Sequence, residues 1–303
     1  MRPRLLLVSA LSIFMSSSEA LATGSQGAGA AIDPVGPKDE NSQILSRWSK
    51  RWSDNFTGWH QKEAHRVLLE HGANIGLPGP AVKSPADGTC RAGEGEGCNS
   101  SDVKRDNRRI FVPLCGKTVD VAYLAKLDGV EVVGVEGVAK ALDEFAQENP
   151  ELEMKAPQTL DGAVFERRNG KSTLLLRGDY FDLDSQSTGG QFDAVWDRAS
   201  LVAISPDLRE KYVSVMGGLV RPGGAVLLLA FDRREGTPEA REGGPPYSLN
   251  EEEVRRLFEG ADWVESVTKV AEYDEMEEEA ARARWLSKGL IAAYELLFVI
   301  KAK

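Results

Sequence analysis

The chain has few of the residues that build disulfide frameworks and metal centres. It contains three cysteines and three histidines among 303 residues, which is too few cysteines for a disulfide-stabilised fold. His65 and His71 lie six positions apart in a predicted helix, so they point to different faces and no cysteine or carboxylate cluster joins them. The sequence therefore predicts no metal site. We interpret Cys115 as a small buried core residue, whereas Cys90 and Cys98 either pair in an oxidising compartment or stay reduced.

Concentrated positive charge and long apolar runs are also missing. Lysine and arginine number 37 against 47 aspartates and glutamates, which gives a formal net charge of −10. Because phosphate recognition needs a concentrated basic surface, this balance excludes a nucleic-acid partner. The apolar run at residues 5–15 is shorter than the roughly 20 residues that span a bilayer. We expect no stable membrane span once the N-terminal leader is removed.

The first 22 residues are predicted to be a secretory-type signal peptide. Arg2 and Arg4 precede the apolar run, and residues 20–22, Ala-Leu-Ala, supply a small-x-small cleavage site. This predicts delivery to the secretory pathway or an endomembrane lumen. An uncleaved anchor is one alternative. The front of a plastid presequence is another, because residues 23–31 lack acids and are rich in alanine, glycine and serine.

The rest of the chain divides into a linker and one domain. Residues 23–42 are too poor in apolar side chains to order themselves, so we predict a disordered linker. Residues 43–303 form the predicted domain, and a hydrophobic content of 42% suffices for a substantial core. Residues 72–109 are rich in glycine, proline and charge with little periodicity. We predict that they are a surface insertion.

Apolar strand patterns alternate with helical patterns along this domain. We predict strands at residues 110–114, 130–135, 172–176, 192–196, 225–231, 263–270 and 293–300. Such alternation indicates an α/β fold with a Rossmann-like, mostly parallel sheet of seven strands and helices on both faces. Ligands of such sheets bind at the carboxyl ends of the strands.

The turn after the first strand indicates the kind of ligand. It has one glycine, Gly116, where dinucleotide sites carry a G-x-G-x-x-G run, so no pyrophosphate loop is evident. Glu136 ends the second strand, where a carboxylate can accept hydrogen bonds from ribose hydroxyls. Leu114 and Gly116 frame the turn against which an amino-acid tail can sit. The predicted cofactor is S-adenosyl-L-methionine; a surface glutamate and a plain tight turn are the simpler interpretations.

Four further residues are candidates for the cofactor site. Asp179 follows the third strand, where an acid can accept from an adenine amino group, and its neighbour Tyr180 can cover the ring. Trp48 and Trp52 are spaced i, i+4 and share a helix face. Periodicity alone favours packing of both indoles in the core. An aromatic face also suits the positive charge of a sulfonium.

These motifs resemble the thiopurine S-methyltransferase family. The resemblance lies in PLCGK at residues 113–117 and VVGVE at 132–136, followed by FDAVWDRASLVAISP at 192–206 and GPPYSL at 244–249. Upstream, Trp48, Trp52, Trp59, His60 and Gln61 fall in family order, so the resemblance covers about residues 44–303. It implies a monomeric class I methyltransferase with N-terminal helices over the site and a final antiparallel strand beside the fifth.

The resemblance also implies site residues. It places both tryptophans of the N-terminal helix over the cofactor, and Trp59 where the family commonly has a phenylalanine in its substrate pocket. The larger indole predicts a smaller or differently shaped pocket. The implied acceptor is a small, aromatic or heterocyclic thiol. Halide, thiocyanate or selenium acceptors are the alternative, since G-P-P-Y also occurs in methyltransferases of that kind, and a non-catalytic nucleoside-binding module is a third hypothesis.

Two segments near the predicted acceptor complete the list. Asp197 and Arg198 end the fourth strand, and we predict that this pair is catalytic, with Arg198 touching cofactor or substrate. A nearby guanidinium lowers the pKa of a thiol by stabilising the thiolate. A structural salt bridge is the simpler interpretation. Pro245, Pro246 and Tyr247 form a rigid loop that we expect to wall the acceptor pocket, although a plain proline turn has the same pattern.

Overall fold

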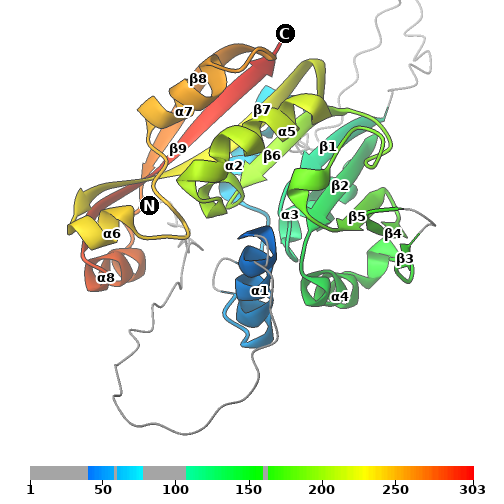
Figure 1. The fold of residues 1–303 in the computed structure, drawn as a ribbon, viewed down its shortest axis with the longest axis horizontal. Helices are drawn as coiled ribbons and strands as arrows, with labels where there is room; N and C mark the ends of the chain where they lie inside the picture. Colours follow the sequence, from blue (N-terminus) through cyan, green and yellow to red (C-terminus); the bar gives the residue numbers. More distant parts are fainter. Residues whose placement is uncertain (1–39, 58–59, 78–106, 160–162) are drawn as a thin grey trace, which may run out of the picture.

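The computed structural model describes residues 40–57, 60–77, 107–159 and 163–303. Several predictions concern residues outside these ranges: the signal peptide, nearly all of the linker, most of the insertion, Trp59, Cys90 and Cys98. The described part of the chain forms one nine-stranded sheet with helices on both faces (Figure 1). The strands follow the order β3-β4-β5-β2-β1-β6-β7-β9-β8.

The seven predicted strands are all present in a mostly parallel sheet. They are β1 (Arg108–Val112), β2 (Val130–Glu136), β5 (Thr173–Arg177), β6 (Phe192–Arg198), β7 (Val220–Gly236), β8 (Val264–Asp274) and β9 (Leu290–Ala302). The first five of these are parallel, whereas β9 is inserted between β7 and β8 and is antiparallel to both. The predicted fold class and the antiparallel final strand are confirmed.

The predicted count of seven strands was too small. A hairpin of β3 (Gln158–Thr159) and β4 (Glu166–Gly170) extends the sheet beyond β5. The sequence of β4 is polar, so it lacks the apolar alternation that indicates a strand. One of its charged residues, Arg168, is nevertheless buried, because its guanidinium donates to Asp143 Oδ1 at 2.6 Å and to the Leu142 carbonyl at 3.2 Å.

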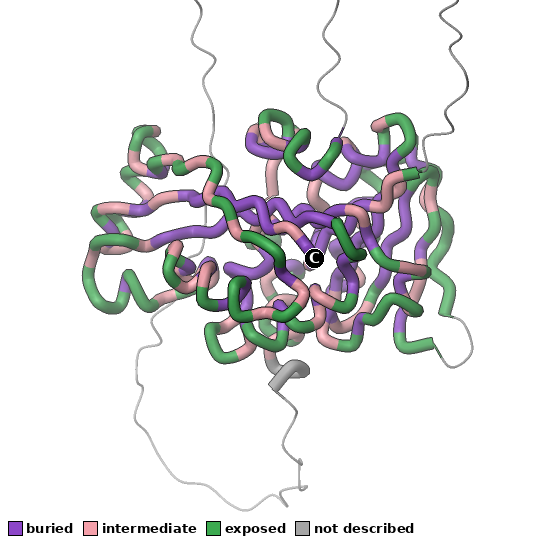
Figure 2. Tube along the Cα trace, turned by 90° about the horizontal axis from the view of Figure 1, so that it is seen from above, coloured by how far each residue is buried: buried purple, intermediate pink, exposed green. Residues whose placement is uncertain are grey.

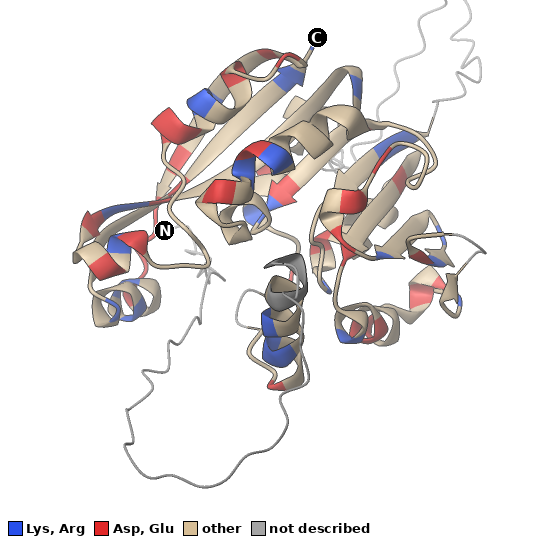
Figure 3. Cartoon of the chain, viewed as in Figure 1, with Lys and Arg blue, Asp and Glu red and all other residues tan. Residues whose placement is uncertain are grey.

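The helices cover both faces of the sheet, and each face has its own hydrophobic cluster. They are α1 (Glu40–Ser53), α2 (Arg66–His71), α3 (Val119–Ala125), α4 (Ala139–Glu148), α5 (Arg209–Leu219), α6 (Pro238–Glu242), α7 (Glu251–Glu259) and α8 (Glu279–Ser287). Because neighbouring residues of a strand point to opposite faces, Phe111 packs with residues of α5 and α7 while Ile110 packs with residues of α2 and α3. Buried chain accordingly fills the middle of the molecule (Figure 2), and charged residues of both signs are spread over the helices and strand ends (Figure 3).

Strands β7 and β9 extend well beyond their predicted ends. The prediction covered the apolar stretches at 225–231 and 293–300, but β7 continues to Gly236 and β9 begins at Leu290. Their paired extensions carry α6 and α8 at one end of the molecule (Figure 1). The polar residues of the β7 extension hid this part of the strand from the apolar pattern.

The predicted insertion is narrower than residues 72–109. Ile75 and Leu77 are buried in the same cluster as α3, and Arg108 begins β1. The guanidinium of Arg108 donates to the Ile75 carbonyl at 3.2 Å, which joins the two ends of the segment. These residues belong to the domain, and the insertion prediction now concerns residues 78–106, outside the described residues.

Candidate active site

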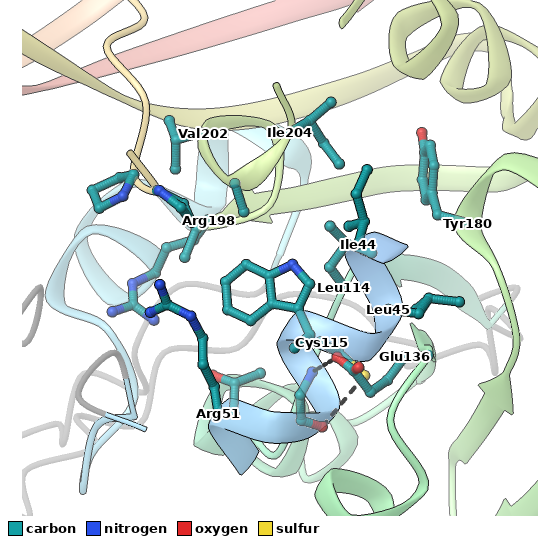
Figure 4. Close-up of a pocket in the computed structure, with 18 of the residues that line it drawn as sticks. Ile44, Leu45, Arg51, Leu114, Cys115, Glu136, Tyr180, Arg198, Val202 and Ile204 are labelled. Carbon is teal, nitrogen blue, oxygen red and sulfur yellow. Dashed lines mark hydrogen bonds between the residues drawn. The ribbon is translucent and has the colours of Figure 1, made fainter. Parts of the chain in front are cut away.

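A cavity of 240 Å³ lies at the carboxyl ends of the parallel strands, beneath α1 (Figure 4). Residues from α1, from the turns after β1, β2, β5 and β6, and from the loop at 244–247 line it. The predicted site residues that line it are Trp48, Trp52, Leu114, Gly116, Glu136, Asp179, Tyr180, Arg198, Pro245, Pro246 and Tyr247. The structure thus brings eleven of the thirteen predicted site residues to one pocket. Trp59 lies outside the described residues, and Asp197 does not line the pocket.

Glu136 holds the turns after β1 and β2 together. Its Oε2 accepts from the Gly116 N–H at 3.0 Å, and its Oε1 accepts from the Val138 N–H at 2.8 Å. Burial raises the pKa of this carboxyl, while these backbone donors act in the opposite direction. A carboxylate oxygen has two lone pairs, so both oxygens can still accept from a ligand hydroxyl in the pocket.

Helix α1 is seated on two glycines. Gly116 has φ +52°, and a Cβ there would lie 3.1 Å from the Trp52 indole. At Gly137, the next residue after β2, a Cβ would overlap the Leu45 side chain. Trp52 is only 2% exposed and packs with Val138. The absence of side chains at these two turns therefore lets α1 close over the strand ends.

The other tryptophan of α1, Trp48, is more accessible than Trp52. Trp48 is partly buried, packs beside Trp52 and lies under the guanidinium of Arg51, whose Cζ is 5.6 Å from the ring centroid. The prediction that both indoles share one face is confirmed. The structure adds that Trp52 mainly packs against protein, whereas Trp48 offers the more open ring.

The turn after β5 places Asp179 in the pocket as predicted, whereas the ring of Tyr180 packs mainly in the core. Asp179 lines the pocket and its Oδ1 accepts from the Phe181 N–H at 2.9 Å. The Tyr180 side chain is committed to the core: its ring stacks on Tyr212 with centroids 4.2 Å apart, and its hydroxyl donates to the Tyr212 carbonyl at 3.0 Å. Tyr180 also lines the pocket from this packed position, and its contact with an adenine stays a prediction. Phe181, which is partly buried and lines the pocket, is a second aromatic ring available for that contact.

The two charged residues that end β6 point to opposite faces of the sheet. Asp197 is fully buried and accepts from the Tyr212 hydroxyl at 2.8 Å and the Leu201 N–H at 3.1 Å. Burial raises its pKa to about 6. The prediction that Asp197 is catalytic is therefore corrected, because strand alternation turns it away from the pocket into the packing with α5. It anchors the segment that follows β6.

Arg198 faces the pocket. Figure 4 shows the side chains of Arg198 and Arg51 extending toward the same part of the cavity. The positive charge of Arg198 also contributes to lowering the pKa of His60 and His65, although burial is the larger cause for each. This part of the pocket favours negative charge.

Two residues that support the site were missed in the sequence. Asp120 is buried and accepts from the Trp196 indole N–H at 2.9 Å and from the His65 N–H at 2.8 Å. Ser200 donates its hydroxyl to the Pro113 carbonyl at 2.6 Å. These bonds tie the end of β6 to the ends of β1 and α3. The only signal for them is that a buried indole needs an acceptor, which does not say which acid supplies it.

Two of the five non-glycine residues with positive φ among the described residues lie at the same strand ends. Leu114 follows β1 closely and Ala199 follows β6 directly, and both are non-glycine residues with positive φ, +43° and +59°. Such conformations cost about 1–3 kcal/mol and persist where the surroundings impose them. Here the hydrogen bond from Ser200 to Pro113 joins the two strained turns.

The loop at 244–247 is fixed against the segment after β6. The Tyr247 N–H donates to the Val202 carbonyl at 2.7 Å, and Pro246 is buried. This contact holds Pro245, Pro246 and Tyr247 at the wall of the cavity. The predicted location of this loop is confirmed, and its role in acceptor binding stays a prediction.

The described residues give little support for metal binding, thiol chemistry or a membrane span. No group of three potential metal ligands occurs among them. Cys115 is buried, and burial raises its pKa well above the usual thiol range, so its reactivity is low. No helix in the described part of the chain has the length and apolar character needed to cross a membrane.

The pocket fits S-adenosyl-L-methionine. Glu136 offers carboxylate lone pairs for ribose hydroxyls, and Gly116 allows close approach of an amino-acid tail. Trp48 offers an aromatic ring to a sulfonium, and no glycine-rich phosphate loop is present at the turn after β1. With the strand order around β9, these features define a class I S-adenosylmethionine-dependent methyltransferase.

Comparison with known proteins identifies the family. The sequence profile of the thiopurine S-methyltransferase family matches residues 98–297. A thiopurine S-methyltransferase of Pseudomonas aeruginosa is 32% identical over 225 residues, which are 73% of this chain and 85% of the relative. A probable thiopurine S-methyltransferase of Danio rerio is 31% identical over 261 residues, 86% of this chain and 95% of the relative. The chain belongs to the thiopurine S-methyltransferase family, as predicted.

A solved structure supports the fold. The chain is similar to a Burkholderia thailandensis 1,6-didemethyltoxoflavin-N1-methyltransferase, which was crystallised with S-adenosylhomocysteine. The TM-score is 0.50 with 16% identity, over 90% of this chain and 93% of that one. This similarity confirms the predicted fold class. The predicted cofactor, S-adenosyl-L-methionine, is supported by membership of the family.

Proposed function

We propose that the protein transfers the methyl group of S-adenosyl-L-methionine to the sulfur of a small aromatic or heterocyclic thiol. The observation that carries this proposal is one pocket with two unlike sides. Glu136 and Gly116 form a cofactor side, and Arg198 with the loop at 244–247 forms a cationic and apolar side next to it. Family membership supports sulfur as the acceptor atom.

The residues of the chain supply position and charge rather than acid and base groups. When bound, the cofactor provides a methyl group on a sulfonium; a new carbon–sulfur bond forms as the sulfonium bond breaks, and the thiol proton goes to solvent. Arg198 stabilises the thiolate and so lowers the pKa of the acceptor thiol. Glu136 and Trp48 orient the other partner, and alignment of two reactants accounts for much of the rate in such a reaction.

Transfer of a labelled methyl group tests the proposal. Purified protein with labelled cofactor should methylate thiophenol-type thiols, with iodide, thiocyanate and a selenol offered in parallel. Preference for iodide, thiocyanate or the selenol would replace the thiol proposal with the alternative acceptor class. Cofactor binding in calorimetry without methylation of any acceptor would indicate a nucleoside-binding module and overturn both enzyme proposals.

We also propose that the chain is a monomer and that residues 1–22 are removed on entry to the secretory pathway. The resemblance of the domain to its family supports the first proposal, and the leader pattern of Arg2, Arg4 and residues 20–22 supports the second. Sedimentation equilibrium tests the oligomeric state. Mass spectrometry of the mature N-terminus tests the leader: a start at residue 23 supports secretion, and a start further along supports a plastid presequence.

A further inference from the structure

A group of basic side chains lies beyond the acceptor side of the pocket, on the extension of the β7–β9 pair. Arg233 is on β7, Arg284 is on α8, and Lys288 immediately follows α8. All three surround the buried ring of Trp285: Arg233 Cζ lies 5.9 Å, Arg284 Cζ 4.7 Å and Lys288 Nζ 5.0 Å from its centroid. Figure 3 shows basic residues on both α8 and α1. The chain as a whole is acidic, so this gathering is local.

Within the part of the chain that the structure describes, two of these cations lack an acidic partner. Among the described residues, no carboxylate oxygen lies within 4.0 Å of the charged nitrogens of Arg233 or Lys288. Arg233 donates one guanidinium N–H to the Ala240 carbonyl, while its Nε is buried without a hydrogen-bond partner. Arg284 differs, because it faces the carboxylate of Glu275 at 3.9 Å.

The local field is unfavourable for these charges. Burial, together with the positive charges of Arg284, Arg233 and Arg51, lowers the pKa of Lys288 to about 8. Burial also lowers the pKa of Arg233 to about 10. Like charges brought together destabilise the fold, and Glu275 faces only Arg284, so an anion bound beside Arg233 and Lys288 would stabilise this arrangement.

The group adjoins the pocket, whose lining includes Arg51 but not Arg233 or Lys288. Arg51 lines the cavity and is close enough to Lys288 to contribute to lowering the pKa of its ammonium. On the other side, Arg233 Nη1 lies beside Gly243, where a Cβ would be 3.3 Å away, and Gly243 directly precedes the loop that walls the acceptor side. A ligand that fills the acceptor side can therefore extend toward Arg51, Lys288 and Arg233.

We infer that Arg51, Arg233 and Lys288 form an anion subsite, and that the methyl acceptor carries a carboxylate at the end of the molecule remote from its thiol. This inference rests on the proposed function. Guanidinium groups bind carboxylates through two parallel hydrogen bonds, and an ammonium adds a point charge. The acceptor is thus an anionic aromatic thiol, with Arg198 at its sulfur end and the subsite at its carboxylate end.

Matched acceptors test the inference. The 3- and 4-mercaptobenzoates should be methylated at least tenfold more efficiently than the corresponding neutral mercaptobenzamides, with the difference mainly in KM. Lys288→Met and Arg233→Met should remove most of this preference while leaving the rate for the amides unchanged. Lys50→Met is the control, because it removes a cation of α1 that is 77% exposed in its side chain and paired with Asp54. Equal or better methylation of the amides by the unaltered protein would overturn the inference.

Binding without turnover separates failure of the subsite from failure of the proposed function. In calorimetry on the full chain, benzoate should bind at least tenfold more tightly than benzamide, and the Lys288→Met variant should lose that difference. If benzoate shows this preference but no thiol is methylated, the subsite stands and the proposed function fails. If thiols are methylated but neither benzoate nor the mercaptobenzoates are preferred, the proposed function stands and the subsite is wrong. Lys288→Met keeps the test valid should Arg233→Met fail to fold, since Lys288 is only partly buried.

Discussion

The two sides of the pocket are built differently. The cofactor side is made by the backbone of two adjacent turns and one carboxylate: Glu136 accepts from the amides of both turns, and glycines let α1 approach them. The acceptor side is made by long basic side chains from α1 and β6 and by the loop at 244–247, which are far apart in the sequence. A backbone-built site tolerates few changes of residue, whereas a site of separate side chains can change its ligand by substitution at one position.

The largest effect is expected from removing the central acid of the cofactor side. In Glu136→Ala, the amides of Gly116 and Val138 lose their acceptor and the cofactor loses its ribose partner. We expect cofactor affinity to fall several-hundredfold, about 3.5 kcal/mol, since each ribose hydroxyl left without an acceptor in the complex costs about 1–3 kcal/mol. Calorimetric titration measures this. Glu131→Ala, at the other end of β2, is the control, and normal binding by the Glu136 variant would disprove the ribose assignment.

Asp197 lies beneath the boundary between the two sides, and its effect should depend on pH. Its folded-state pKa of about 6 lies above the ordinary value of 3.8, so the folded protein holds this proton more tightly than the unfolded chain. The stabilising contribution is complete below pH 4 and is lost as the pH rises to 6, by about 3 kcal/mol. Denaturant titrations should show the free energy of unfolding of the protein falling relative to Asp197→Asn across this range. A flat difference would contradict a buried carboxyl.

A smaller effect is expected at the glycine under Trp52. Gly116→Ala places a Cβ on a residue with φ +52° and 3.1 Å from the indole, so both strain and contact act. We expect a loss of about 2 kcal/mol, of which the left-handed backbone accounts for about 1. Gly223→Ala is the matched control, because its φ is +72° and nothing lies within 4 Å of the added Cβ. Thermal unfolding of both variants separates the cost of the contact with Trp52 from the cost of the backbone strain. Equal losses of stability would show that the added Cβ makes no unfavourable contact with Trp52.

The smallest effect concerns the acceptor side. Arg198→Met removes the charge that favours the thiolate, so the pKa of a bound thiol should rise. If the shift is about one unit, kcat/KM falls about tenfold below the thiol pKa and recovers above it. The pH profile of thiol methylation measures this, and a loss that is the same at every pH would assign Arg198 to binding alone.

The sequence allowed the cofactor side to be predicted because its determinants are local. Gly116 and Glu136 follow apolar strands whose ends the hydrophobic pattern defines, and the turn chemistry indicates a nucleoside. The strand β4 was missed because Arg168 is a buried cation whose partners lie on α4. The orientation of Asp197 could have been predicted, because neighbouring residues of a strand point to opposite faces of the sheet and Arg198 faces the pocket.

The acceptor side was less predictable for a physical reason. The contact between Trp196 and Asp120 joins residues 76 positions apart, and nothing in either local sequence shows the pairing. Arg233 and Lys288 come together only because β7 and β9 pair beyond their apolar segments. Long-range pairing of polar residues leaves no periodic pattern in one sequence.

The two glycines on which α1 packs, Gly116 and Gly137, also couple the evolution of the cofactor side to that of the acceptor side. Any larger side chain at Gly116 or Gly137 would push against Trp52 or Leu45 and so tilt the helix that carries Arg51. A mutation selected for its effect on cofactor affinity at these turns would therefore alter acceptor selectivity as well. Divergence toward new acceptors is freest at Arg233 and Lys288, because substitutions there leave the seat of α1 intact.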